Sequence, residues 1–114
     1  PLKAFQSMGF DRNVVVLTHL EDHRVKDRDA ALVRLFYRKY PAFCRTFENS
    51  PQDYKRTQAY LKSEEQKGSV FIIRPLEPIP VGRLSHDPQA IIRAYEMGCR
   101  DAQEVSKNLL RWIA

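Results

Sequence analysis

The segment SVFIIRPLEPIP, residues 69–80, decides the fold of this chain. Its residues 70–73 are apolar without interruption, which is typical of a strand that is buried on both faces of a sheet. A second run rich in β-branched residues, NVVVLT at 13–18, predicts a second buried strand. Because a helical stretch separates the two runs, we expect both strands in one parallel sheet with a right-handed crossover.

Apolar residues spaced three and four apart predict helices around these strands. The first expected helix covers residues 1–8, and the second begins at Ala30 and is ended or kinked by Pro41. A third covers residues 51–67 with Ser50 as N-cap, and a fourth begins at Pro88 with Asp87 as N-cap. The last covers residues 100–113. Expected helix ends lie at Gly9, Gly68 and Gly98. In the helix that opens at Pro88, we expect Ile91, Ile92 and Tyr95 to face inward.

The order of these elements predicts an α/β protein, with a partial parallel sheet of two strands covered by several helices, in a single domain over residues 1–114. Two parallel strands alone would leave two apolar edges open, which favours aggregation. We therefore expect the missing strands to come from a second copy of the chain or from the remainder of a larger protein. The opening residue Pro1, in place of an initiator methionine, fits a piece of a longer protein and equally a processed chain.

The composition limits the classes of partner and the cellular location. A net charge of +5 attracts nucleic acid, anionic lipid or acidic proteins without selecting among them. The chain has no RNA- or DNA-binding motif, so we expect no nucleic acid partner. It also has neither a run of about 20 apolar residues nor a signal peptide. Its two cysteines, Cys44 and Cys99, are expected to be buried free thiols, which predicts a cytoplasmic protein. The aromatic and basic stretch at residues 35–43 adds the option of peripheral contact with a membrane.

Polar residues follow the first strand in the stretch HLEDH, where His19 and His23 flank two acids. Imidazole and carboxylate are zinc ligands, but the zincin pattern needs Glu directly after the first His, and Leu20 occupies that position. We therefore expect a solvated loop with no metal and no cofactor. Ligand clefts of open parallel sheets lie beyond the carboxyl ends of the strands, so this loop is predicted to line the rim of a cleft.

The loop after the second strand receives the same prediction, because it also leaves a carboxyl end. Its candidates for contact with a lipid phosphate are Arg74, Arg83 and His86, since guanidinium matches the geometry of phosphate. In the alternative interpretation, Arg74 pairs with a nearby carboxylate and the prolines only stiffen the connection.

The stretch LFYRKYPAF, residues 35–43, interleaves aromatic and basic residues. Such stretches bind at membrane interfaces or stack on nucleic acid bases. The candidates for contact with a membrane are Tyr37, Arg38 and Lys39. Helical spacing also allows a core face, made of Leu35, Phe36, Tyr40 and Phe43.

Five segments of the chain, in their order, resemble the closing portion of bacterial patatin-like phospholipases. The segments are PLKAF, MGFDRNVVVLT, FYRKYP, VFIIRPLEPIPVGRLSHDP and AYEMGCRDA, and they are distributed over residues 1–102, so the resemblance spans most of the chain. The resemblance implies an α/β sandwich that hydrolyses lipid acyl esters with a Ser–Asp dyad, the Ser in a G-x-S-x-G motif and the Asp in a D-G motif. Neither motif occurs in this chain. In the family, the D-G motif lies shortly before the sequence segment that PLKAF resembles.

The resemblance therefore implies the C-terminal region of a patatin-like acyl hydrolase, with a structural and cleft-rim role and no catalytic residue of its own. The isolated chain is expected to be inactive, and its phospholipid or acyl-ester substrate would bind through the absent N-terminal part. The alternative, from a different class, is an independent α/β interaction module that completes its sheet as a dimer.

Overall fold

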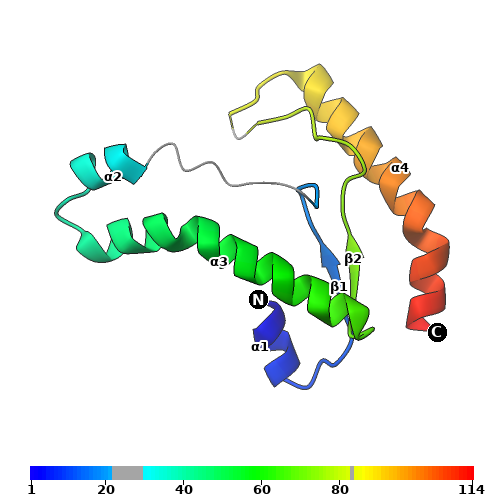
Figure 1. Cartoon of the computed structure of the whole chain (residues 1–114). Helices are drawn as coiled ribbons and strands as arrows, with labels where there is room; N and C mark the ends of the chain where they lie inside the picture. Colours follow the sequence, from blue (N-terminus) through cyan, green and yellow to red (C-terminus); the bar gives the residue numbers. More distant parts are fainter. Residues whose placement is uncertain (22–29, 83) are drawn as a thin grey trace. The chain divides into compact units, whose positions relative to one another are not determined.

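A computed structural model describes residues 1–21, 30–82 and 84–114 of the chain (Figure 1). The elements in chain order are α1 (Leu2–Ser7), β1 (Asn13–Val16), α2 (Ala30–Phe36), α3 (Pro41–Gln66), β2 (Val70–Ile73) and α4 (Pro88–Ile113). Contacts group the chain into two compact units, Pro1–His23 with Glu65–Ala114 and Arg24–Glu64. The first unit holds α1, both strands and α4, and the second holds α2 and nearly all of α3.

The two strands pair in parallel, as predicted, and Figure 1 shows their arrows side by side. The register pairs Asn13 with Val70 at one end and Val16 with Ile73 at the other. Paired residues of neighbouring strands point to the same face of a sheet. One face therefore carries residues 13, 15, 70 and 72, and the opposite face carries residues 14, 16, 71 and 73.

Burial differs sharply between the two strands. In β2, Val70 is 1% exposed and Ile72 is 8% exposed, and α4 packs against this strand. In β1, Val14 is 43% exposed and Val16 is 69% exposed. The prediction that both runs are buried on both faces is therefore wrong for β1, because no described element of the first unit covers these two valines.

The outer edge of β1 is also open. The N–H groups of Asn13 and Leu17 donate to the carbonyls of Ser69 and Ile73 at 3.0 and 2.8 Å. Since alternate residues of a strand direct their N–H groups to opposite sides, the N–H groups of Val14 and Val16 point away from β2. Within the described residues β2 is the sole strand that pairs with β1.

The N-terminus of α4 was predicted correctly. The side chain of Asp87 accepts a hydrogen bond from the backbone N–H of Gln89 at 3.0 Å, and Pro88 occupies the first turn. The predicted break at Gly98 is wrong, because the helix continues to Ile113. One glycine costs a helix interior only about 1 kcal/mol, which packing along the rest of the helix can offset.

The inward face of α4 differs from the prediction in its first half. The less exposed residues, apart from Ser106, follow a spacing of three and four and are Ala90, Ala94, Met97, Asp101, Val105, Leu109 and Trp112. Ile91, Ile92 and Tyr95 were expected to face inward, but all three are exposed. Two adjacent apolar stripes run along this part of the helix, and the spacing alone did not determine which of them is covered.

Proline has two different roles in the second unit. Pro41 ends the helical run, as expected, and begins α3 after a turn. Pro51 was predicted to open a new helix capped by Ser50, and this prediction is wrong because Pro51 lies inside α3. The Ser50 hydroxyl donates to the carbonyl of Phe47 at 2.7 Å instead of capping a helix. A long helix tolerates the single hydrogen bond that an internal proline removes.

The two cysteines are free and lie in different environments. Cys44 is buried, as predicted, and its thiol donates to the carbonyl of Tyr37 at 3.3 Å. Cys99 is exposed on α4, so the prediction of a buried thiol is wrong there, because this side of the helix is the uncovered one.

Candidate functional site

The loops that follow β1 and β2 meet beyond the carboxyl ends of the strands. They enclose a hollow of about 560 Å³. Its lining residues are Thr18, His19, Leu20, Pro75, Glu77, Pro78, Ile79 and Val81. Most of the lining is apolar, with a few polar groups, as is usual for a site that binds an organic ligand. The position is the one where open parallel sheets bind their ligands, and the sequence predicted a cleft rim there.

An ion pair joins the two loops next to this hollow. The guanidinium of Arg74 lies 3.9 Å from the carboxylate of Glu21. This geometry supports the interpretation in which Arg74 pairs with a nearby carboxylate. Because Glu21 is largely exposed, the pair contributes about 1 kcal/mol or less to stability. Its main effect is to orient the Arg74 side chain toward the loop that carries His19.

Asp101 fastens the loop at residues 75–81, which we name the proline loop, to α4. It is 5% exposed, and its Oδ2 accepts the backbone N–H of Leu76 at 3.2 Å. Its Oδ1 accepts from the guanidinium of Arg100 at 3.3 Å. The sequence interpretation missed this residue. The signal was present, because Asp101 falls on the same helical stripe as Met97 and Val105, and an acid on an apolar stripe needs a hydrogen-bond donor.

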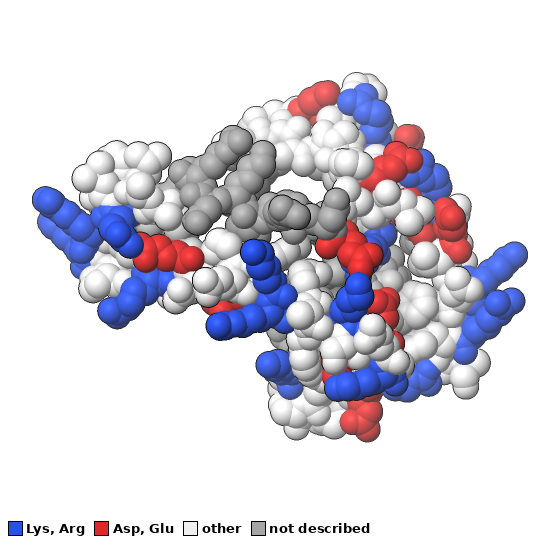
Figure 2. All heavy atoms as spheres, viewed as in Figure 1, with Lys and Arg blue, Asp and Glu red and all other residues white. Residues whose placement is uncertain are grey.

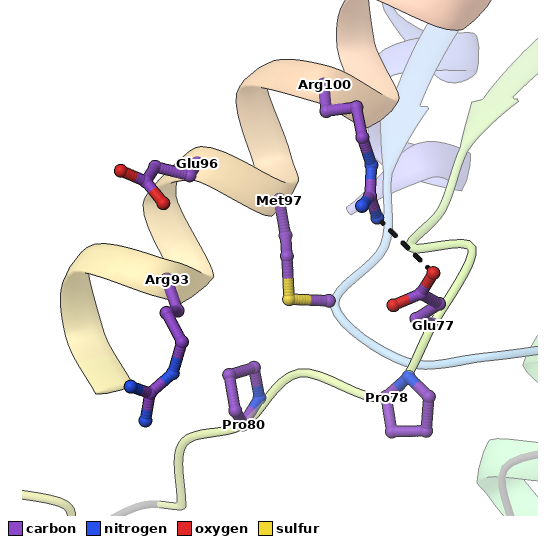
Figure 3. Close-up of a pocket in the computed structure, with 7 residues that line it drawn as sticks. All are labelled: Glu77, Pro78, Pro80, Arg93, Glu96, Met97 and Arg100. Atoms are coloured by element: carbon purple, nitrogen blue, oxygen red, sulfur yellow. Dashed lines mark ion pairs between the residues drawn. The ribbon is translucent and has the colours of Figure 1, made fainter. Parts of the chain in front are cut away.

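A second hollow, of about 490 Å³, lies between the proline loop and α4 (Figure 3). It is lined by Glu77, Pro78, Pro80, Arg93, Glu96, Met97 and Arg100. Figure 3 shows Arg100 directed at Glu77, and the two charged groups lie 3.7 Å apart. Glu77 and Pro78 line both hollows, so the loop between Pro75 and Val81 separates them. Two arginines and two glutamates balance in charge here, which gives this second hollow no preference for an anion.

The other predicted site residues do not all lie in the described part of the first unit. His86 is exposed beside the helix cap and lines neither hollow. His23 and Arg83 lie outside the described residues, so their predicted contacts stay predictions. Tyr37, Arg38 and Lys39 lie in the turn between α2 and α3, in the other unit.

The described residues also include no group of three His, Cys, Asp or Glu side chains arranged to hold a metal ion.

Residues 40–114 match a protein family described as Domain of unknown function (DUF6363). The match covers more than half of the chain, so the chain belongs to this family. It includes α4, β2 and the proline loop of the candidate site. The searches of curated proteins and of solved structures returned no match.

Proposed function

We propose that this chain is the C-terminal part of a patatin-like serine acyl hydrolase that acts on phospholipid or other acyl esters. In that enzyme, a serine outside this chain would attack the ester carbonyl, an aspartate would activate the serine, and backbone N–H groups would hold the oxyanion. This chain would supply two strands of the sheet, part of its helical cover and the loops at the rim of the cleft.

The open edge and uncovered face of β1 carry this proposal. The exposed side chains of Val14 and Val16 lie on the strand whose outer N–H groups point away from β2. A native protein rarely leaves an apolar strand edge of this kind unpaired. A further parallel strand on the outer side of β1 would pair these N–H groups and, with its own helices, cover both valines.

The hollow at the carboxyl ends supports the substrate class. Leu20, Pro75 and Ile79 give it apolar walls that suit an acyl chain. His19 and Glu77 supply polar groups at its border. Their role in this proposal is to bind and orient the ester, because bond cleavage belongs to the dyad outside this chain.

The proposal is tested on the gene that encodes the chain. Upstream of the codon for Pro1, we expect an in-frame G-x-S-x-G motif followed by a D-G motif. The product of the complete reading frame should hydrolyse a p-nitrophenyl ester, and replacement of the motif serine by alanine should reduce the rate to that of buffer. A start codon directly before Pro1 would contradict the proposal.

The isolated chain is expected to show no esterase activity, because it contains neither the G-x-S-x-G motif nor the D-G motif. The measurement is p-nitrophenyl butyrate hydrolysis by the purified chain, with a His19→Ala variant in parallel. Turnover above the buffer rate that depends on His19 would contradict the proposal.

The open edge of β1 is compatible with one alternative, an interaction module that completes its sheet by dimerising. Sedimentation velocity separates the two functions. A stable dimer that Val14→Lys dissociates would favour the module, whereas a monomer or a nonspecific aggregate agrees with the hydrolase proposal.

A further inference from the structure

The second unit carries an exposed surface that the hydrolase proposal does not use. It consists of α2, the turn at residues 37–40 and residues 41–47 of α3, which we name the hairpin tip. The large apolar side chains exposed on it are Leu32, Leu35, Phe36, Tyr37, Tyr40 and Phe43. Phe36 is the most exposed of them, at 74%. An apolar cluster of this kind usually marks a site of interaction with a protein or a membrane.

The hairpin tip is built to present these side chains rather than to bury them. The Cys44 thiol donates to the carbonyl of Tyr37, and the guanidinium of Arg34 lies 2.6 Å from the carboxylate of Glu48. The rings of Tyr37 and Phe43 lie 5.1 Å apart across the turn. These contacts hold α2, the turn and the start of α3 together, and the six large apolar side chains remain between 48% and 74% exposed.

The charge of the hairpin tip has one sign. Residues 31–47 include Arg34, Arg38, Lys39 and Arg45 and no Asp or Glu. Arg34 pairs with Glu48, beyond the end of this stretch. No carboxylate in the described part of the chain pairs with the other three cations. At the left of the view, Figure 2 shows Lys and Arg atoms beside uncharged atoms, with Asp or Glu atoms next to them.

We propose that the hairpin tip docks on an anionic lipid surface. Exposed aromatic and aliphatic side chains enter the boundary between head groups and acyl chains, and the adjacent cations contact the anionic head groups. The complementary charge favours this occupant, because a protein partner would need an acidic rim around an apolar groove. Bases of single-stranded nucleic acid stack on rings, and the aliphatic residues Leu32 and Leu35 offer none.

The docking is peripheral. None of the helices in the described part of the chain is both long enough and apolar enough to cross a bilayer. The hairpin tip therefore contributes side chains to the interface and does not span it. The proposal is independent of the hydrolase proposal, because vesicle binding is measured without turnover and either result can hold alone.

The test measures partition of the chain onto vesicles of phosphatidylcholine with phosphatidylserine and onto vesicles of phosphatidylcholine alone. We expect binding to the anionic vesicles that weakens as salt is added. The variant Arg38→Glu/Lys39→Glu should bind at least about 20-fold more weakly, since each cation near such a surface contributes roughly a factor of five. The conservative variant Arg38→Lys/Lys39→Arg should keep the binding.

The control variant Lys55→Glu/Lys107→Glu makes the same change in net charge at exposed positions away from the hairpin tip. It should lose much less affinity.

A second pair of variants tests how much the apolar side chains contribute to vesicle binding. Leu35→Ser/Phe36→Ser should reduce partition onto the vesicles by about 10-fold or more. The substitutions remove two apolar side chains from the boundary between head groups and acyl chains. Leu84→Ser/Leu110→Ser removes two apolar side chains that are also exposed but lie outside the hairpin tip, and it should have little effect. Far-UV circular dichroism of each variant verifies that the helices are retained.

Four results of these measurements would overturn the proposal, and a fifth would come from a comparison with RNA. They are absence of binding to anionic vesicles, equal binding to both vesicle types, equal losses in the hairpin and control variants, and a shift in oligomeric state caused by Leu35→Ser/Phe36→Ser. The last would assign the hairpin tip to contact between copies of the chain. A single-stranded RNA oligonucleotide that binds more tightly than the vesicles, with the same response to Arg38→Glu/Lys39→Glu, would assign it to nucleic acid.

Discussion

Replacement of Asp101 by alanine is expected to lower the free energy of unfolding by about 2 kcal/mol. The substitution removes the carboxylate that accepts the N–H of Leu76 and the guanidinium of Arg100. The N–H of Leu76 is then left without this acceptor in a partly buried place, and the proline loop loses its attachment to α4. Urea unfolding followed by the fluorescence of Trp112, the single tryptophan, measures the change.

Two further variants separate the anchoring role from general effects on α4. Asp101→Asn keeps an acceptor oxygen for the N–H of Leu76 and should lose less than half as much stability. Glu104→Ala removes an exposed acid from the same helix and should change stability by less than about 0.5 kcal/mol. If Asp101→Ala behaves like Glu104→Ala, the anchoring role of Asp101 is wrong.

Replacement of Trp112 by alanine is expected to lower the free energy of unfolding by about 3 kcal/mol, near the lower limit for a large aromatic residue because the ring is only half-buried. Its ring centroid lies 5.7 Å from that of Phe71, and its indole N–H donates to the carbonyl of Gly68 at 3.2 Å. The guanidinium of Arg12 lies 4.3 Å from the ring centroid. Trp112 therefore fastens the end of α4 to β2 and to the segment before β1.

The Trp112→Ala variant is followed by far-UV circular dichroism, because the fluorescent probe is lost. Trp112→Phe keeps the aromatic contact and loses the N–H donor, so it should lose only about 1 kcal/mol. Leu110→Ala, at an exposed position two residues earlier, is the matched control and should have little effect. Equal stability of Trp112→Ala and Leu110→Ala would contradict the role of the tryptophan.

The sheet was predictable because its signal is local and strong. Continuous apolar runs of β-branched residues gave both strands, and the helical segment between them gave the parallel pairing that the register confirms. Asp87 followed by Pro88 gave the start of α4 for the same reason, since a cap and a first-turn proline act within one turn.

Whether a helix continues through Gly98 or Pro51 was less predictable. Each of these residues locally disfavours a helix, whereas packing along the whole helix favours it. A breaker contributes about 1 kcal/mol for glycine and about 3 kcal/mol for proline, and a long helix can offset either amount. The burial of Asp101 was missed because the sequence prediction divides α4 at Gly98, and this break separates Asp101 from Met97 on the same stripe. The choice between two apolar stripes on α4 depends on tertiary contacts.

The sequence predicts where the rim of a cleft would lie, but not which side chains meet there. The rule that clefts follow the carboxyl ends of parallel strands placed His19 and the proline loop together, and both line the first hollow. The pairing of Arg74 with Glu21 needed the distance between two loops that are remote in sequence, so the sequence left it as one of two interpretations.

The account depends on β1 being an inner strand of a wider sheet. Amide hydrogen exchange at Val14 and Val16 tests this most directly, compared by NMR between the isolated chain and the product of the complete reading frame. The account predicts fast exchange in the isolated chain and exchange at least about 100-fold slower in the complete product, where a further strand accepts these N–H groups. Equally fast exchange of both amides in the two proteins would contradict it.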